Sequence, residues 1–417
     1  MSVSSTPSRL LGLRLLNGVG GALRAAGLPL VRLDEASLLA EASRRARLDD
    51  FGDDAFRDPL RRLLASYESE ARLTLLGRLI ARRDAVRLLE NRLHLADTCR
   101  RHPEIAAEPV RAPIVVVGLP RTGTTVLHAL LAQDPENRVP MTWEVMHPWP
   151  APERATYDTD PRIAQVERHF AGVDRVIPGF KSMHPMGALL PQECVALTAH
   201  EFATMIYHTA NRVPSYQRWL DGADLRWVYR AHRRWLQYLQ WRCPGERWVL
   251  KSPGHLWALD ALRAEYPDVR IVQTHRDPLK VVASLASLVA ALRSMATDEI
   301  DAHEIGADWT ARLADGLERS MVARANGMLP PSQVLDVQFH DLVRDEIATV
   351  RRIYSHFGLT LSAAAEARMR AFLAANPREK HGVHRYALSA AGLDEATERR
   401  RYAAYEARFA IPREPVD

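Results

Sequence analysis

A short loop in the first half of the chain has the residue types of a phosphate-binding site. Residues 118–125 read GLPRTGTT, so two glycines five positions apart are followed by two threonines. The frame matches the P-loop G-x-x-x-x-G-K-[ST], except that Thr124 stands where the lysine would reach the β- and γ-phosphates. Arg121 is the only basic residue in the loop. Backbone N–H groups and one cation would suit a ligand with a single 5′ phospho-group better than ATP or GTP.

A second segment, THRDPLKVVASL at 274–285, has the residues for another anion site. Arg276 follows a predicted strand, while Asp277 can cap the next helix and Pro278 can occupy its first position. Ser284 lies about two helical turns after Asp277 and so returns to the same face. We expect Arg276 and Ser284 to converge on one anion. Two anion sites at neighbouring strand ends would suit a nucleotide with phosphates at both its 5′ and 3′ positions.

Alternating strand and helix patterns must position these residues. PIVVVG at 113–118 is a continuous β-branched run that ends in glycine, which is typical of a buried parallel strand. Amphipathic helical patterns separate it from three later strand candidates, at 247–251, 269–275 and 333–339. This order predicts the α/β class, with a P-loop-like parallel sheet flanked by helices.

The remaining segments are predicted to be mostly helical. We expect residues 1–110 to form an N-terminal helical region packed on the core, because apolar positions recur there at helical spacing. Residues 111–390 would form the nucleotide-binding domain. Within it, 150–245 is rich in Trp and Tyr and too long for a simple crossover, so we interpret it as an acceptor-binding insertion. Residues 391–417 would form a C-terminal helix and tail.

Composition limits the class of ligand and the compartment. The net charge of +5 and the pI near 9.2 favour anions. Arginines alternate with acidic residues along the whole chain, without a nucleic-acid-binding module or a basic tail, so we expect a small anion and no nucleic acid. The cysteines, Cys99, Cys194 and Cys243, form no C-x-x-C pair. This spacing favours a reducing compartment, the cytoplasm, over a disulfide framework or a zinc site.

The sequence contains no run that is long and apolar enough for a membrane span or a signal-peptide core. Residues 10–31 are apolar but interrupted by Arg14 and Arg24. We expect them to form a helix packed on the body, and peripheral contact with a membrane surface stays open as the alternative. The helices before residue 108 could also form the face of a homo-oligomer.

Taken in this order and spacing, the motifs resemble those of sulfotransferases that use 3′-phosphoadenosine 5′-phosphosulfate (PAPS). GLPRTGTT resembles the family's 5′-phosphosulfate loop, and R-D-P with a serine eight residues after the arginine resembles its 3′-phosphate motif. Four further segments resemble the large bacterial branch, itself similar to tyrosylprotein sulfotransferases: LKSPGHL at 250–256, TWE at 142–144, QFHDLVRD at 338–345 and PREKHGVHRY at 377–386. The resemblance runs from about residue 110 to 390.

The resemblance implies roles for individual residues. Those expected around the 5′-phosphosulfate are Arg121 and the backbone of Thr122, Gly123, Thr124 and Thr125. Lys251 would bridge the sulfonate and the leaving oxygen, where negative charge builds in the transition state. The segment expected to close over the 3′-phosphate contains Arg378, Lys380, His381 and Gly382, although Glu379 interrupts its basic residues and a flexible basic loop is the alternative.

The general base has more than one candidate. Glu144 is the first choice, because tyrosylprotein sulfotransferases place a glutamate at a similar interval after the loop. His255 is the second, since the start of a helix there would lower the imidazole pKa and keep it neutral. The alternative, purely structural roles are an ion pair for Glu144 and a helix-cap contact for His255. Glu193 could line the acceptor pocket, though a helix-surface acid is the default interpretation. Trp143 is a candidate for stacking on adenine, with buried core as its default.

We therefore expect a sulfotransferase that moves the sulfuryl group of PAPS, without a metal, to a hydroxyl or amine of an amphiphilic small molecule or lipid. The transfer would be an in-line displacement assisted by a general base. The alternative is a P-loop kinase-like enzyme that uses a nucleoside triphosphate. That alternative would require Mg²⁺ and the loop lysine, and the loop lacks the lysine.

Overall fold

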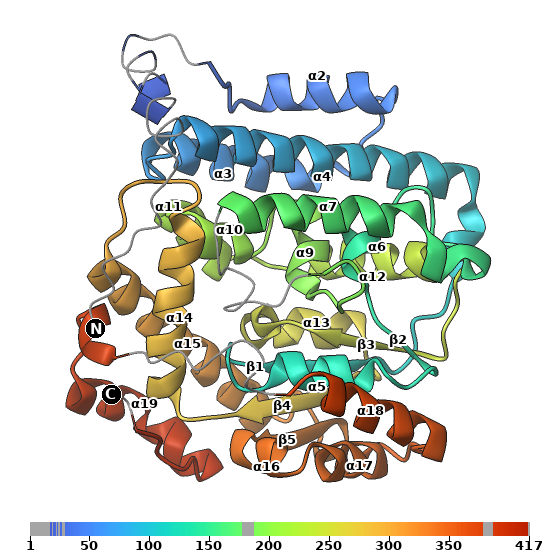
Figure 1. The fold of residues 1–417 in the computed structure, drawn as a ribbon, viewed down its shortest axis with the longest axis vertical. Helices are drawn as coiled ribbons and strands as arrows, with labels where there is room; N and C mark the ends of the chain where they lie inside the picture. Colours follow the sequence, from blue (N-terminus) through green and yellow to red (C-terminus); the bar gives the residue numbers. More distant parts are fainter. Residues whose placement is uncertain are drawn as a thin grey trace.

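A five-stranded parallel sheet lies at the centre of the chain (Figure 1). The computed structural model describes residues 30–176, 187–377 and 387–415, with scattered positions between 17 and 26. The strand order is β2-β3-β1-β4-β5, with bounds Asn137–Arg138, Arg247–Lys251, Ile114–Gly118, Arg270–His275 and Val334–Gln338. The α/β class and the four expected strands are confirmed. The two-residue β2 was not predicted, because so short a strand carries no periodicity.

Both faces of the sheet are covered, which explains the continuous apolar runs of its strands. All five residues of β1 are buried. Val115 and Val117 pack into one hydrophobic cluster, whereas Ile114 and Val116 pack into another. Alternate side chains of a strand point to opposite faces, so the two clusters lie on the two sides of the sheet.

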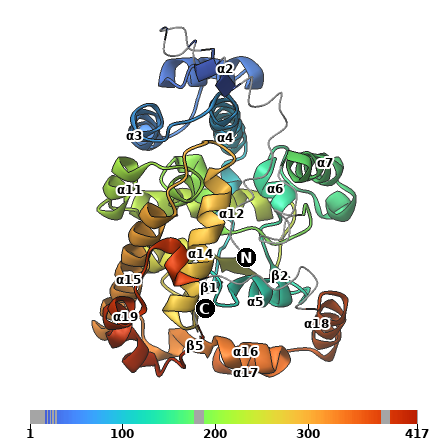
Figure 2. The same cartoon turned by 60° about the vertical axis from the view of Figure 1, so that its left-hand side comes forward.

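Helices from both halves of the chain form these two layers (Figures 1 and 2). The first cluster is completed by α12 (Arg226–Gln240), α13 (Leu259–Glu265), α14 (Pro278–Arg293), α15 (Ala302–Ala325) and α19 (Glu395–Phe409). The second is completed by α5 (Thr124–Leu131), α16 (Phe339–Arg344), α17 (Glu346–His356) and α18 (Ala363–Ala375). Between β3 and α13 the chain forms a short 3-10 turn at Pro253–Trp257.

The N-terminal helices stack on the insertion rather than on the sheet itself. The N-terminal helices are α2 (Glu35–Ala46), α3 (Arg57–Ser69) and α4 (Leu75–Arg101). The short α6 (Thr142–Met146) precedes the insertion. The insertion contributes α7 (Pro161–Val176), α9 (Cys194–Thr198), α10 (Ile206–Ala210), α11 (Pro214–Asp221) and α12. A separate hydrophobic cluster joins Leu60 and Leu89 of the first group to Phe202, Tyr216 and Val228 of the second. The described residues of both segments are mostly helical.

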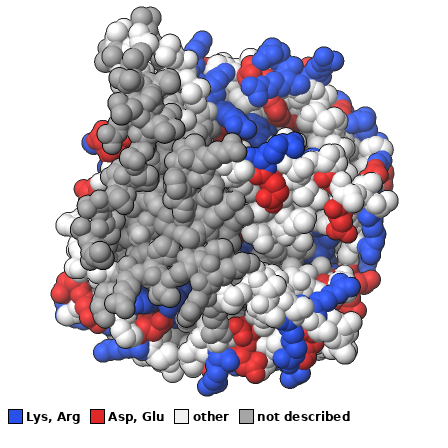
Figure 3. Space-filling view, in the orientation of Figure 1, with Lys and Arg blue, Asp and Glu red and all other residues white. Residues whose placement is uncertain are grey.

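The described surface carries mixed charge. On the face shown in Figure 3, basic and acidic side chains are interspersed. Among the described helices, none has the length and apolarity required to cross a bilayer. The stretch at 10–31, for which packing on the body or a membrane surface was expected, lies for the most part outside the described residues.

A glycine in α4 shows how closely the N-terminal region approaches the core. A Cβ atom built on Gly77 would overlap the backbone carbonyl of Ala296, in the loop that follows α14. This carbonyl also accepts hydrogen bonds from the Thr74 N–H at 2.9 Å and the Thr74 hydroxyl at 3.1 Å. The contact therefore leaves no room for a side chain at Gly77.

We predict that Gly77→Ala lowers the free energy of unfolding by about 1–3 kcal/mol, because the added methyl must displace backbone. Gly172→Ala in α7, where no described residue lies within 4 Å of the added atom, is the matched control. It should be neutral or stabilising, since alanine is the better helix former by about 1 kcal/mol. Thermal unfolding monitored by circular dichroism measures both variants. A Gly77→Ala protein as stable as the wild type would contradict the close packing.

Candidate active site

The loop between β1 and α5 has the backbone shape of an anion cradle. Positive φ angles occur at Gly118 (148°), Arg121 (67°) and Gly123 (87°). A Cβ on Gly118 would overlap the Thr274 hydroxyl, and one on Gly123 would lie 2.6 Å from Leu342 Cδ2. Glycine is therefore required at both ends of the loop. The chain turns sharply there and leads into the first N–H groups of α5, which have no partner within the helix itself.

Hydroxyl groups fix the loop to the neighbouring strand. Thr122 Oγ1 donates to the Leu119 carbonyl at 2.6 Å and lies 2.6 Å from the Thr274 hydroxyl of β4. Thr122 and Thr124 are buried, whereas Thr125 and Arg121 are exposed. The expected loop residues are thus brought together, and the exposed ones remain accessible to a ligand.

Lys251 lies beside this loop. It ends β3, which pairs directly with β1, and its Nζ lies 3.4 Å from Thr125 Oγ1. Its side chain is only 3% exposed, and its ammonium group contacts the Glu193 carboxylate. Glu193 occupies the position that precedes the first residue of α9. A buried ammonium requires a counter-charge, and this carboxylate supplies it.

Arg276 lies on the opposite side of the loop, at the end of β4. Its Nη1 donates to the Arg121 carbonyl at 2.8 Å, and its guanidinium lies 3.9 Å from the centre of the Phe339 ring. The two motifs predicted to bind anions are therefore in direct contact. Ser284 is buried within α14, on the helix that Asp277 caps through the Leu279 N–H at 2.9 Å.

The structure does not favour Glu144 as the general base. Its side chain is fully buried, and both carboxylate oxygens are held by Arg138, at 2.6 and 2.8 Å. One of them also accepts the Met141 N–H at 2.8 Å, at the start of α6. Such a carboxylate holds α6 to β2 and offers no group to a substrate. Glu144 thus forms the structural ion pair that was the alternative interpretation of this residue.

His255 is neutral, as expected, but for a different reason. Burial, with a smaller contribution from nearby His232, lowers the pKa of His255 to about 3. The helix start to which we attributed the shift is only a short 3-10 turn. The Tyr229 hydroxyl lies 2.6 Å from its Nδ1, and its Nε2 has no hydrogen-bond partner among the described residues.

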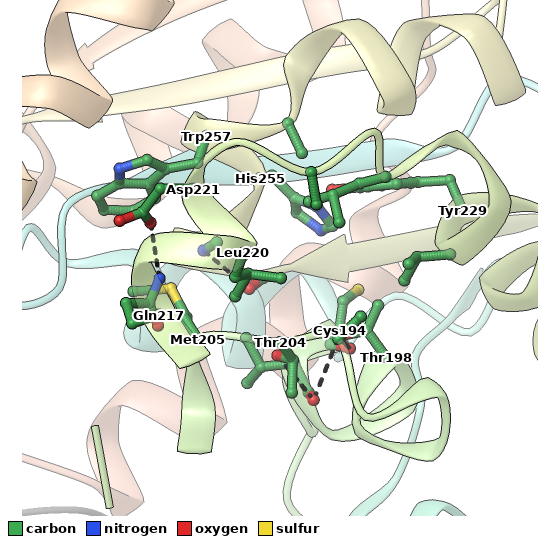
Figure 4. A pocket seen from close by; sticks show the side chains of 18 of the residues that line it. Cys194, Thr198, Thr204, Met205, Gln217, Leu220, Asp221, Tyr229, His255 and Trp257 are labelled. Atoms are coloured by element: carbon green, nitrogen blue, oxygen red, sulfur yellow. Dashed lines mark hydrogen bonds between the residues drawn. The ribbon is translucent and has the colours of Figure 1, made fainter. Parts of the chain in front are cut away.

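His255 and Tyr229 line a cavity of about 130 Å³ (Figure 4). Tyr229 lies on one side of it, Trp257 and Asp221 on the other, and Cys194 and Thr204 near its floor. Its further apolar lining includes Val195, Met205, Leu220, Leu225, Val228 and Trp309. Cys194 follows Glu193 and Ser252 follows Lys251, so the cavity begins one residue from the lysine–carboxylate contact.

Two further predictions concern the segment over the 3′-phosphate and the stacking residue Trp143. The segment expected over the 3′-phosphate, with Arg378, Lys380, His381 and Gly382, lies outside the described residues. Trp143 is fully buried, 5.2 Å from Tyr157 and 4.7 Å from the Arg162 guanidinium. It belongs to the core, so it cannot stack on a nucleotide.

Sequence reasoning undervalued one acidic residue and missed another. Glu193 was considered a helix-surface acid, but it contacts Lys251 from 58 residues away in the chain. Glu414 was not considered, and its carboxylate binds Arg276 from 138 residues away. The only signal in the sequence was that each cation would need a counter-charge when buried. That requirement does not name the partner.

Four buried histidines make stability depend on pH. Burial lowers the pKa of each to about 3, and the four are His128, His200, His232 and His255. The folded protein keeps them neutral, whereas the unfolded chain binds protons below about pH 6.5. Their contribution to stability is therefore present above about pH 6.5 and lost as the pH falls toward 3.

We predict that the free energy of unfolding falls between pH 7 and pH 5, and that His255→Asn reduces the slope by up to about 1.4 kcal/mol per pH unit. Urea unfolding at several pH values measures the slope. His303→Gln, at an exposed position, is the control that should leave the slope unchanged. An unchanged slope for His255→Asn would show that this imidazole takes up protons equally in both states.

Comparisons with known proteins agree with this geometry. The model of the sulfotransferase family matches residues 113–363, more than half of the chain. The omega-hydroxy-beta-dihydromenaquinone-9 sulfotransferase of Mycobacterium tuberculosis (strain CDC 1551 / Oshkosh) is 25% identical over 290 residues, which are 65% of this chain and 68% of that protein. The same identity and coverage are found for its counterpart from Mycobacterium bovis (strain ATCC BAA-935 / AF2122/97).

Two solved structures are similar over nearly the whole chain. Sulfotransferase STF1 from Mycobacterium tuberculosis H37Rv is 37% identical, with a TM-score of 0.80, and the match covers 89% of this chain and 98% of that one. Sulfotransferase STF9 from Mycobacterium avium is 30% identical, with a TM-score of 0.85 and coverage of 91% and 98%. These matches confirm the enzyme class expected from the motifs and decide against the kinase-like alternative. The chain belongs to the sulfotransferase family.

Proposed function

We propose that this enzyme transfers the sulfuryl group of PAPS to a hydroxyl group of a small amphiphilic or lipid acceptor. The observation that carries the proposal is the position of Lys251. Its ammonium group lies beside the loop threonine Thr125 and contacts the Glu193 carboxylate. A cation and a carboxylate are thus in contact beside the loop that is proposed to bind the 5′-phosphosulfate, and sulfuryl transfer requires both.

The two anion motifs fit the two ends of the donor. The 5′-phosphosulfate would lie against the N–H groups of residues 122–125, close to Arg121 and Lys251. The 3′-phosphate would lie at Arg276, whose contact with the Arg121 carbonyl sets the two sites side by side. We retain Ser284 and the basic segment 378–382 as further proposed contacts of the 3′-phosphate.

The reaction is an in-line displacement at sulfur. The acceptor oxygen forms a bond to sulfur while the bond from sulfur to the 5′-phosphate oxygen breaks. The electron pair of that bond leaves on the phosphate, giving 3′,5′-adenosine bisphosphate. Lys251 and the loop N–H groups stabilise the charge that grows on the departing oxygen. The acceptor's proton passes to a general base of the protein.

Glu193 is the base that the described contacts support best. Its carboxylate already touches the ammonium group that would bind the donor, and its side chain is 20% exposed. Glu144 is held in a buried ion pair. His255 is neutral at working pH, but it is bonded to Tyr229 and shielded in the cavity wall. Once Lys251 turns to the sulfonate, Glu193 is left next to the attacking hydroxyl.

The acceptor class is argued from the cavity and from one relative. The cavity is lined by Cys194 and Ser252, the residues that follow Glu193 and Lys251 in the chain, and more than half of its lining residues are apolar, which suits the apolar part of an alcohol. The relative at 25% identity is named as acting on omega-hydroxy-beta-dihydromenaquinone-9. We assign the reaction to the cytoplasm, because Cys99, Cys194 and Cys243 are free thiols.

We predict that 3′,5′-adenosine bisphosphate binds in metal-free buffer with micromolar affinity, and that Arg276→Ala weakens binding at least tenfold, because the 3′-phosphate loses its charged partner. Isothermal titration calorimetry measures both, with ATP and Mg²⁺ titrated in parallel. Arg319→Ala, at an exposed arginine that lines the cavity, is the control and should not change the affinity. Tight binding of ATP with Mg²⁺, together with indifference to the 3′-phosphate, would overturn the proposed donor.

We predict that Glu193→Gln lowers kcat by about 10²–10⁴-fold, because the amide cannot accept the proton. The affinity for 3′,5′-adenosine bisphosphate should change far less. Glu144→Gln should instead lower the thermal stability, since it leaves Arg138 buried without its charge partner. Release of the bisphosphate from PAPS in the presence of an acceptor alcohol, followed chromatographically, gives the rates. A Glu193→Gln enzyme with wild-type kcat would exclude Glu193 as the base.

A further inference from the structure

The chain ends in a tail that returns to the nucleotide-binding edge of the sheet. After α19, residues 411–415 run to the start of α14. The Glu414 carboxylate accepts hydrogen bonds from Arg276 Nε and Nη2, both at 2.7 Å. The Glu414 N–H donates to Asp277 Oδ2 at 2.7 Å, and the Pro415 carbonyl accepts from Lys280 Nζ at 2.7 Å.

Glu414 in the tail thus binds the nitrogen atoms of Arg276 that the donor's 3′-phosphate is proposed to bind. One nitrogen of Arg276 is bound to the Arg121 carbonyl, and its planar face lies over Phe339. The edge that remains, formed by Nε and Nη2, is the one that binds two oxygens of a carboxylate or a phosphate in parallel. Glu414 holds this edge, so carboxylate and phosphate would compete for the same pair of donors.

The position of the tail is fixed by the helix before it. Arg399 of α19 binds the Asp277 carboxylate through two nitrogens, at 2.8 and 2.9 Å. The Tyr405 hydroxyl lies 2.9 Å from His275 Nδ1, and the Phe409 ring stacks on His275 at 4.2 Å. Because α19 contacts His275 and Asp277, the two sequence neighbours of Arg276, it keeps Glu414 close to the arginine. The effective concentration of the carboxylate at Arg276 is therefore high.

The contact is also open enough to be exchanged. The side chain of Arg276 is 18% exposed and that of Glu414 is 28% exposed, in contrast to the fully buried Asp277. Because both side chains reach solvent, a doubly charged phosphate can approach Arg276 and replace the singly charged carboxylate. Asp277, which anchors the tail, is therefore buried, whereas the Glu414 carboxylate, which would compete with the phosphate, is accessible to solvent.

We propose that the C-terminal tail is a built-in competitor for the donor, with Glu414 occupying the 3′-phosphate site until the nucleotide displaces it. The inference rests on the proposed function, since it assigns the 3′-phosphate to Arg276. The tail lowers the apparent affinity for PAPS and for the bisphosphate product by the fraction of molecules in which the site is closed. Nucleotides that lack the 3′-phosphate do not meet this competition.

The test compares Glu414→Gln with the wild-type full chain by calorimetry, using 3′,5′-adenosine bisphosphate and 5′-AMP as probes. The variant should bind the bisphosphate about tenfold more tightly, because the open fraction rises, and bind 5′-AMP as the wild type does. Arg413→Gln, a charge change at the neighbouring residue whose side chain is 71% exposed, is the matched control and should not alter either affinity.

The outcomes separate the inference from the function on which it rests. Equal or weaker binding of the bisphosphate by Glu414→Gln, with wild-type binding that still depends on Arg276, would overturn the tail as competitor and leave the donor assignment intact. Weaker binding would show that Glu414 instead orients Arg276 for the nucleotide. If the wild type and Glu414→Gln both fail to distinguish the bisphosphate from 5′-AMP, the donor assignment and the inference fall together.

Discussion

A cation that has lost its water must find a counter-charge, and this constraint organises the carboxyl edge of the sheet. Three adjacent strands, β3, β1 and β4, end there side by side. They deliver Lys251, the glycine loop and Arg276 to one place. In this structure the chain supplies carboxylates to both cations: Glu193 binds Lys251 and Glu414 binds Arg276. These carboxylates stand where the donor's anionic groups are proposed to bind.

The two ion pairs have different consequences in the proposed mechanism. When Lys251 turns from Glu193 to the sulfonate, the carboxylate it leaves is adjacent to the acceptor and can take a proton. When Arg276 turns from Glu414 to the 3′-phosphate, the tail has to move away. The first exchange prepares the chemistry, whereas the second only opens the site. The free energy of donor binding must offset both, so affinity is set partly by residues that never touch the nucleotide.

Much of the fold followed from local signals. The β-branched run before Gly118, the glycine spacing of the loop and the alternation of strands with helices each depend on neighbouring residues, and all were confirmed. The adjacency of the loop and Arg276 also followed, because parallel strands share one carboxyl edge. These features depend on backbone conformation and periodicity, which a single sequence displays directly.

The partners of charged groups could not be predicted in the same way. Glu144 lies at the interval expected of a base, yet it pairs with Arg138 only six residues away, on the neighbouring two-residue β2. Glu193 and Glu414 reach their cations from 58 and 138 residues away. Such choices depend on which acid the folded chain brings within hydrogen-bond distance, and no local pattern records that. The neutral His255 was expected, but its cause is burial, which also depends on tertiary packing.

A crystal structure of the complex with 3′,5′-adenosine bisphosphate would show whether the nucleotide replaces the two carboxylates. We expect the 5′-phosphate to lie against residues 122–125, with Lys251 turned toward it and away from Glu193. We expect the 3′-phosphate on the Nε–Nη2 edge of Arg276, with Glu414 displaced. A nucleotide bound elsewhere, with the Lys251–Glu193 and Arg276–Glu414 pairs both intact, would contradict both expectations.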